Sequence, residues 1–263
     1  MTSAWVLPDH LADVLPSEAR QIEELRRLFL DCARSYGYEL VIPPLLEHLE
    51  SLLSGTGSRL DLQTFKLVDQ LSGRTLGVRP DTTPQVARID AHLLNRSGVC
   101  RLCYCGPVLH TLPERPFATR EPLQLGAELF GHAGLEADLE VLELALSGLA
   151  AVECKNIQVD FGDARVLKSL LAGLNLSPND ALSIRQALAN KDEQRVISLA
   201  KTLSLPEATG QALKVLVHLY GDARVVQEGI EAFSAWPDVV KALNELLWLS
   251  AHLGVKVSFD LAD

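Results

Sequence analysis

Two segments decide the fold of this chain: VCRLCYCGPVLHT at residues 99–111 and EPLQLGAELF at residues 121–130. Both are rich in apolar residues and have the length of a strand. The loop between them carries Pro113 and Pro116, and proline is typical of turns and sheet edges. The pattern therefore predicts two central antiparallel strands joined by this loop.

The residues before this pair alternate between helix and strand signals. A serine cap and a terminating glycine delimit the first helix, and Thr83 with Pro84 is predicted to open the last one. In chain order we predict a helix between Ser17 and Gly37, a strand at 39–42, a helix at 45–53, a hairpin of strands at 64–68 and 75–79, and a helix from Thr83 to about Asn95.

The residues after the pair change in character. A helix at 136–153 and a strand at 156–161 are followed by short helical patterns without a convincing strand, and an alternating segment at 255–261 predicts a last strand. These signals predict an α+β fold. The expected domains are a core at 1–162, a helical insert at 163–253, and a strand at 254–263 that returns to the core.

The composition restricts the class of protein. The 263 residues carry 24 Lys and Arg against 34 Asp and Glu, a net charge of −10 at pH 7, and 48% of them are hydrophobic. These values are typical of a globular chain with a core, and they exclude a disordered or collagenous one. The acidic balance argues against a broad nucleic-acid surface, because phosphate binding draws on clustered Lys and Arg.

The expected compartment is the cytoplasm. The N-terminal residues lack a basic start followed by an apolar run, and the apolar stretches are too short to cross a bilayer. The five cysteines are an odd number, which argues against a disulfide framework.

Cys100, Cys103 and Cys105 are the first candidates for a metal site. Structural zinc sites use four ligands in paired short spacings, and no second pair of Cys or His follows at a suitable distance. On a strand, Cys103 and Cys105 share one face while Cys100 points to the other. We therefore interpret them as small buried apolar residues and expect no metal and no cofactor.

The segment VRPDTTP at residues 78–84 places a carboxylate and two hydroxyls where a strand turns into a helix. Asp and Thr commonly cap helices, and capping is the preferred interpretation of this segment by itself. The alternative is that Asp81 is a carboxylate that holds an ammonium group.

Gln124, Gly126 and Glu128 alternate along the second central strand and therefore face the same way. An amide, a position without a side chain and a carboxylate then line one surface. Because desolvating a carboxylate is costly, a central strand rarely carries one on a sheet face without a partner. The alternative interpretation is a solvated sheet face. If Asp81 lies nearby, the two acids form a pocket for a cationic small molecule such as an amino acid.

The order of the segments resembles class II aminoacyl-tRNA synthetases, above all histidyl-tRNA synthetase. GYELVIPPLLE at 37–47 resembles motif 1, and VRPDTTP followed by Arg88 resembles the Arg-Pro-Glu-x-Thr segment of that enzyme. CGPVL at 105–109 and QLGAE at 124–128 resemble the two strands of motif 2. The resemblance implies a class II antiparallel sheet with flanking helices and a helical insert.

Two departures from the synthetases argue against a synthetase activity. His110 stands where the family has the arginine that grips the ATP α-phosphate, and Leu112 stands where it has a glutamate. An imidazole lacks the planar, permanently charged fork of arginine, and a leucine side chain accepts no hydrogen bond. The resemblance therefore implies no catalytic residue in this chain and a badly impaired activation of amino acids.

RPDTTPQVARIDAH at 79–92 is similar to a narrower family, the regulatory subunits of ATP phosphoribosyltransferase. Such subunits assemble with the short catalytic subunit in the first step of histidine biosynthesis, and they are implicated in its activation and in feedback inhibition by histidine. The resemblance implies that Asp81 and Thr83 hold the α-amino group of L-histidine, while Gln124 and Glu128 help to form the pocket. It also implies a dimer through the class II core and no bound tRNA.

The family continues past the last strand into a segment resembling Leu-Arg-x-Tyr-x-Tyr and then motif 3, whereas this chain ends at Asp263. We therefore expect a chain truncated before motif 3. Two other functions compete with the regulatory one. The first is an active class II synthetase-like enzyme that adenylates an amino acid, and the second is a histidine sensor for another partner.

Overall fold

The computed structural model describes residues 6–55 and 58–262, which fall into two compact units. Unit 1 comprises Met1–Cys154 and unit 2 comprises Lys155–Asp263, whereas the sequence predicted a boundary after residue 162. Residues 1–5 and 56–57 of the predicted core, and Asp263 of the predicted last strand, lie outside the described residues.

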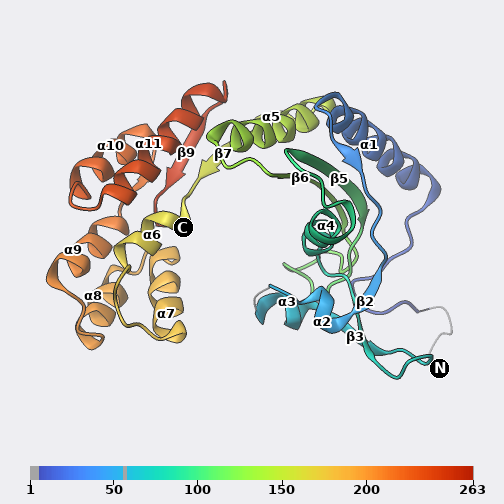
Figure 1. Ribbon diagram of the computed structural model, residues 1–263, viewed down its shortest axis with the longest axis horizontal. Coiled ribbons are helices and arrows are strands. Elements are labelled where there is room, and N and C mark those ends of the chain that lie inside the picture. Colours follow the sequence, from blue (N-terminus) through green and yellow to red (C-terminus); the bar gives the residue numbers. More distant parts are fainter. Residues whose placement is uncertain (1–5, 56–57, 263) are drawn as a thin grey trace. The chain divides into compact units, whose positions relative to one another are not determined.

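Unit 1 contains two three-stranded sheets and the helices that surround them (Figure 1). Its elements are α1 (Pro16–Ser35), β1 (Glu39–Leu40), β2 (Leu46–His48), α2 (Leu49–Leu52), α3 (Ser58–Gln63), β3 (Phe65–Val68), β4 (Thr75–Val78), α4 (Thr83–Arg88), the π-helix η1 (Ile89–Leu94), β5 (Cys100–Pro107), β6 (Leu123–Phe130) and α5 (Leu135–Ala151).

The first sheet has the order β1-β5-β6. Strands β5 and β6 are antiparallel along their whole length, from Cys100 opposite Phe130 to Pro107 opposite Leu123. The two central strands expected from the sequence are therefore confirmed. β1 adds to the other side of β5 in parallel orientation.

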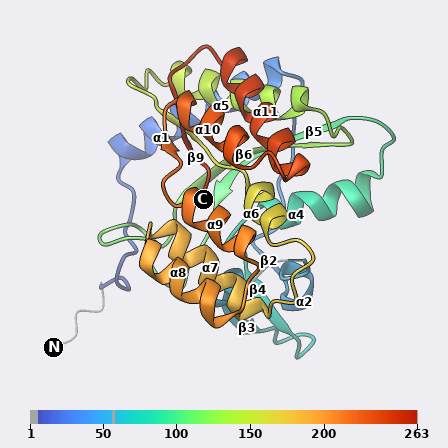
Figure 2. The same ribbon diagram turned by 90° about the vertical axis from the view of Figure 1, so that its left-hand side faces the viewer.

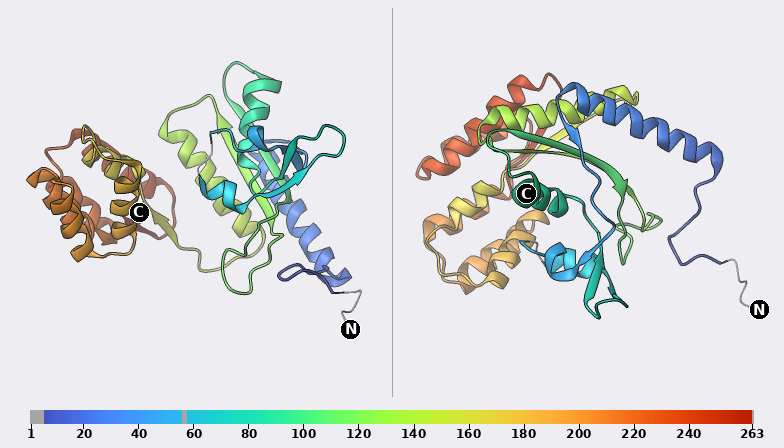
Figure 3. Two further views of the ribbon diagram at one scale, coloured as in Figure 1. Left: turned by 90° about the horizontal axis from the view of Figure 1, so that it is seen from below. Right: turned by 45° about the vertical axis from the view of Figure 1, so that its right-hand side comes forward.

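Helices cover both faces of this sheet. Side chains alternate along β5, so Cys103 packs on one face with Ala33 of α1 and Leu144 of α5. Tyr104 packs on the other face with Val86 of α4. Figure 1 and the right-hand view of Figure 3 show α1 and α5 along one face and α4 against the other. The turn that precedes α4 is thereby brought to the face of β6 that carries the predicted site residues.

The cysteines occupy separate places in this packing. Cys100 lies with Tyr104 on the α4 face, and Cys103 lies on the opposite face. Both are buried, as predicted for small apolar residues, whereas Cys105, for which the same was predicted, is only partly buried. Among the described residues, no group of three or more His, Cys, Asp or Glu side chains is arranged to hold a metal ion.

The second sheet has the order β2-β4-β3. Its β3–β4 hairpin confirms the predicted one, with Phe65 opposite Val78 and Gly73 in the turn at a φ of +73°. The prediction of a helix at 45–53 is wrong in its first half, because Leu46–His48 pair with β4 as β2 and only Leu49–Leu52 are helical. A short apolar run of this kind does not distinguish a strand from a helix by its periodicity.

The helix predicted from Thr83 to about Asn95 is present as α4 and η1, which follow one another without a break. Asn95 ends it in the left-handed region, at a φ of +43°. The cap differs from the prediction, since Thr82 rather than Thr83 is the N-cap residue. Thr83 is thus the first helical residue, and its hydroxyl is available to other groups.

Unit 2 is mainly helical, and Figure 2 shows its helices from yellow to red. Its elements are β7 (Val159–Phe161), α6 (Ala164–Leu170), α7 (Pro178–Ala189), α8 (Glu193–Thr202), α9 (Glu207–Leu216), β8 (Tyr220–Gly221), α10 (Ala223–Ala232), α11 (Pro237–His252) and β9 (Val257–Asp260). Asp163, Ser177, Asp192 and Asp222 cap four of these helices with their side chains.

The last strand, β9, lies in the middle of a small sheet of unit 2 with the order β7-β9-β8. It runs parallel to β7 and antiparallel to β8. Phe161 and Phe259 meet edge to face across β7 and β9, with ring centroids 5.9 Å apart. The sequence placed β7 within the core of residues 1–162, whereas the structure assigns both β7 and β9 to unit 2.

In the part of the chain that the structure describes, no helix combines the length and the apolar character that crossing a bilayer requires.

Candidate functional site

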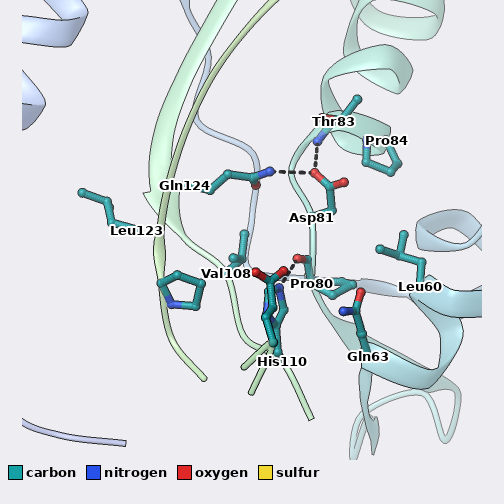
Figure 4. A pocket seen from close by; sticks show the side chains of 12 residues that line it. Leu60, Gln63, Pro80, Asp81, Thr83, Pro84, Val108, His110, Leu123 and Gln124 are labelled. Carbon is teal, nitrogen blue, oxygen red and sulfur yellow. Dashed lines mark hydrogen bonds between the residues drawn. The ribbon is translucent and has the colours of Figure 1, made fainter. Parts of the chain in front are cut away.

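Asp81 lies in the turn between β4 and α4. Its Oδ1 accepts a hydrogen bond from the Thr83 amide at 2.9 Å, as in an Asx-turn, and a second one from Gln124 Nε2 at 2.9 Å. The Thr82 amide in turn donates to Gln124 Oε1 at 2.9 Å. The two bonds of Gln124 fasten the turn to β6 and the third bond lies within the turn, so Asp81, Thr83 and Gln124 form one hydrogen-bonded group (Figure 4).

Glu128 is connected to this group through Tyr104, which lies on β5. The Tyr104 hydroxyl is 3.0 Å from Thr83 Oγ1 and donates to Glu128 Oε1 at 3.4 Å. Burial raises the pKa of Tyr104 to about 12. Burial also raises the pKa of Glu128, although hydrogen bonds from Thr83 and Tyr104 favour its charged form. A carboxylate held in this way favours a ligand that brings a positive charge or a hydrogen-bond donor.

Gly126 separates Gln124 from Glu128 on β6 and lies directly opposite Tyr104 of β5. A Cβ atom at position 126 would lie only 2.2 Å from Cζ of the Tyr104 ring. The absence of a side chain at this position therefore gives the aromatic ring room to lie between the two polar residues. This is the physical reason for the glycine between the amide and the carboxylate.

A cavity of about 550 Å³ opens beside Asp81 (Figure 4). Asp81 and Glu114 contribute two carboxylates to it, and its described lining contains neither Lys nor Arg. Such a cavity attracts cations and repels phosphate groups. The lining consists of Leu60, Gln63, Pro80, Asp81, Thr83, Pro84, Val108, His110, Glu114, Pro122, Leu123 and Gln124.

His110 is only 6% exposed, and its ring is fixed against the backbone. The Nε2 atom lies 2.9 Å from the carbonyl oxygen of Pro80 and donates to it, because a carbonyl oxygen only accepts. Leu112, by contrast, is 71% exposed. His110 thus holds the backbone at Pro80, the residue before Asp81, and Leu112 projects into solvent.

Sequence reasoning missed two members of the site, Tyr104 and Glu114. Tyr104 lies in the apolar-rich segment 99–111 and Glu114 in the loop between the two strands, and the sequence assigned a role to neither. Gly126 was the available signal for Tyr104, because a position without a side chain in a central strand often marks the close approach of another group. The pairing register that places Tyr104 opposite Gly126 was not available from the sequence.

Comparison with known proteins shows to which family this chain belongs. Residues 10–263 match the histidyl-tRNA synthetase family. The ATP phosphoribosyltransferase regulatory subunit of Acidovorax ebreus (strain TPSY) is 61% identical over 262 residues, which is 99% of this chain and 68% of that protein.

Two solved structures are also similar. An ATP phosphoribosyltransferase regulatory subunit/histidyl-tRNA synthetase from Bacillus halodurans C matches 100% of this chain and 69% of its own, with 27% identity and a TM-score of 0.85. A chain of the ATP phosphoribosyl transferase (HisG:HisZ) complex from Thermotoga maritima is 18% identical with a TM-score of 0.63, over 95% of this chain and 82% of its own. At that identity the second structure supports the fold alone.

The fold and the family match define the class of protein: this is a histidyl-tRNA synthetase-like chain with the class II fold. Within that class, the chain belongs to the family of ATP phosphoribosyltransferase regulatory subunits.

Proposed function

We propose that this chain acts with a short catalytic subunit of ATP phosphoribosyltransferase in the first step of histidine biosynthesis, and that it mediates feedback inhibition by L-histidine. Membership of the regulatory-subunit family supports the first part. The observation that carries the second part is the hydrogen-bonded group of Asp81, Thr83 and Gln124 beside an acidic cavity.

The chemistry of this group suits the α-ammonium of an amino acid. Asp81 uses Oδ1 for both of its bonds, and among the described residues its Oδ2 accepts none. An ammonium group brings three donors, and this group of residues offers three acceptors of the matching kind: Asp81 Oδ2, the Thr83 hydroxyl and the Gln124 amide oxygen. Glu128 is linked to this group through Tyr104 and is not in the described lining of the cavity, so its proposed part is to support the pocket from behind Tyr104.

The same geometry argues against a synthetase activity of this chain. Adenylation requires a fixed positive charge at the α-phosphate, and the described lining of the cavity supplies two carboxylates and no Lys or Arg. The sequence resemblance matches His110 to the synthetase arginine, and in the structure the His110 Nε2 donates to the Pro80 carbonyl. Amino-acid-dependent exchange of pyrophosphate into ATP would revive the synthetase hypothesis.

Reconstitution tests the proposed role. The full-length protein is purified with the short catalytic subunit from the same organism, and formation of phosphoribosyl-ATP is measured with and without it. Activity that depends on this protein and falls as histidine is added is the expected result. If the catalytic activity requires this protein but does not fall with histidine, histidine is not the ligand and the regulatory role stands. If the catalytic activity does not require this protein, both parts of the proposal are overturned.

We further propose that the chain forms a dimer through the motif 1 segment. Leu40, Ile42, Leu45 and Leu46 are between 43% and 78% exposed and follow one another along the chain at the edges of the two sheets of unit 1. A second copy would remove these apolar side chains from water. The acidic net charge and the five free cysteines are consistent with a cytoplasmic protein that binds no tRNA.

A further inference from the structure

Two buried polar residues flank the turn that carries Asp81 and Thr83. Arg79 precedes Asp81 by two positions and is 4% exposed, and Gln85 follows Thr83 by two positions and is 1% exposed. The described lining of the cavity includes neither of them. Burial of a guanidinium and an amide is costly unless hydrogen bonds compensate for the lost water, so their partners indicate what they do.

Both side chains bond to the same dipeptide. Arg79 Nη1 donates to the carbonyl oxygen of Pro43 at 2.9 Å, and Gln85 Nε2 donates to that of Pro44 at 2.9 Å. Because the proline rings fix φ at two successive residues, these two acceptors belong to a stiff piece of backbone. The two ends of residues 79–85 are therefore attached to one rigid support.

Additional bonds secure the two residues themselves. Arg79 Nε donates to the Pro107 carbonyl at the end of β5 at 2.9 Å, and Gln85 Nε2 also reaches Glu47 Oε2 at 3.1 Å. A Cβ atom at Gly106 would lie 2.6 Å from Arg79 Nη2, so the glycine leaves room for the guanidinium. Among the described residues Arg79 forms no ion pair, and its side chain donates only to backbone carbonyls. Its contacts therefore tie backbone segments together.

We propose that Arg79 and Gln85 are positioning residues for the ligand pocket. They fasten both ends of residues 79–85 to the Pro43 and Pro44 carbonyls and so hold Asp81 and the Thr82 amide at bonding distance from Gln124. The inference rests on the proposed function for the identity of the ligand, L-histidine, but the position of the turn is a property of the free protein. The two can therefore be tested separately.

The test uses the full-length protein with three single variants. Gln85→Met keeps the volume and removes the donor to Pro44, and Arg79→Lys keeps the charge but loses the fork that spans Pro43 and Pro107. Gln186→Met, on the exposed face of α7, is the matched control for a glutamine on a helix. Hydrogen–deuterium exchange at the Thr82 and Thr83 amides reports the position of the turn, and calorimetry reports histidine affinity.

We expect exchange at both amides and the dissociation constant for histidine to rise about tenfold in Gln85→Met and Arg79→Lys, the effect of losing roughly one hydrogen bond. The control should change neither. Unchanged exchange in a folded variant overturns the proposal, and if one variant fails to fold the other decides. A uniform rise in exchange across unit 1 would indicate a merely structural role and also overturn it. If the unmodified protein binds no histidine, the proposed ligand fails, and the exchange data alone decide the positioning role.

Discussion

Asp81 provides the most direct test of the pocket at the level of a single residue. In Asp81→Asn the side-chain oxygen still accepts the bonds from the Thr83 amide and Gln124, but the negative charge is lost. Because charge-assisted bonds contribute about 1.5–3 kcal/mol, we expect histidine affinity to fall roughly 10- to 100-fold while the melting temperature stays close to that of the unmodified protein. Calorimetric titration measures the affinity. Asp138→Asn, an exposed acid in the first turn of α5, is the control, and equal effects of the two substitutions would contradict the assignment.

Glu128 gives a pH-dependent prediction of definite sign. Burial raises its pKa in the folded protein, so the folded state binds its proton more readily than the unfolded state. The protonated Glu128 side chain therefore contributes fully to stability at pH values below the ordinary pKa of a carboxyl group. This contribution is lost as the pH rises through the raised pKa of the folded state. We expect Glu128→Gln to be more stable than the unmodified protein at pH 7, with the difference shrinking as the pH is lowered. Urea unfolding across this pH range measures it, and a difference that grows toward low pH would contradict the prediction.

Gly126 is expected to tolerate no side chain. Gly126→Ala places a methyl group 2.2 Å from the Tyr104 ring, and overpacking of this kind costs about 1–3 kcal/mol of unfolding free energy. Gly210→Ala is the matched control, because Gly210 lies inside α9 with its nearest neighbour, Ala200 Cβ, at an ordinary 3.6 Å, and alanine favours a helix interior. Chemical denaturation should show a loss for the first substitution and no loss for the second. Similar midpoints would show that the ring moves aside freely.

The structure links three of the four site residues expected from the sequence. Thr83 and Gln124 both bond to Asp81, whereas Glu128, the second acid of the expected pocket, bonds to Tyr104 and is not in the described lining of the cavity. Tyr104 was missed because its role depends on the register of β5 against β6, a non-local property. Whether these residues bind histidine stays a prediction.

At the scale of elements, one ion pair fastens α5 to the central sheet. Arg101 of β5 donates to both carboxylate oxygens of Glu140, from Nε at 2.6 Å and from Nη2 at 2.7 Å. The hydrogen bond from Arg101 is the main reason that the pKa of Glu140 is lowered. A bidentate pair that is partly shielded from water contributes more than an exposed one.

We expect Arg101→Met to lower the free energy of unfolding by about 1–2 kcal/mol at neutral pH. The pKa of Glu140 is lowered in the folded state, so the ion pair contributes to stability at pH values above the ordinary pKa of a carboxyl group and ceases to contribute as the pH falls through the lowered pKa. The effect of the substitution should therefore shrink in acid. Urea unfolding at neutral and acidic pH measures it. Arg27→Met removes an exposed pair with Glu23 and should change stability by less than about 0.5 kcal/mol. An equal loss in the two variants would contradict the shielding argument.

Element type was predictable where the local signal was strong. The hairpin of β3 and β4, the pair β5 and β6, and the helix before Asn95 follow from turn residues, alternation and a proline at the helix start. The element type of the segment at 45–53 was not predictable in this way. Its first half forms β2 because it pairs with β4, which lies about thirty residues further along the chain. Tertiary pairing overrode local preference there.

For the whole molecule, the sequence predicted a mixed core followed by a helical region, and the structure divides at a similar point. The division falls before β7 because β7 pairs with β9, a strand about a hundred residues later. A pairing over such a distance leaves no local trace in the chain. The boundary was therefore the part of the architecture least accessible to sequence reasoning.

The proposed dimer gives the prediction that belongs to this scale. Ile42 is 78% exposed between the edge strand β1 and the Pro43-Pro44 support of the pocket. A lysine at this position would bring a charge into the proposed apolar interface, and burying an unpaired charge is strongly unfavourable. The interface and the pocket also share a support, so self-association and histidine binding are expected to be coupled, and such coupling is reciprocal.

We therefore expect Ile42→Lys to sediment as a monomer at concentrations where the unmodified full-length protein is a dimer, and to bind histidine more weakly. Histidine should in turn strengthen the dimerisation of the unmodified protein by the same factor, because the two equilibria form one thermodynamic cycle. Leu182→Lys, which changes a half-exposed leucine of α7 in unit 2, is the control and should leave both equilibria unchanged. A dimer that survives Ile42→Lys would exclude the motif 1 segment as the interface. A monomer that binds histidine with unchanged affinity would keep the interface but show that the Pro43-Pro44 support is rigid without a partner.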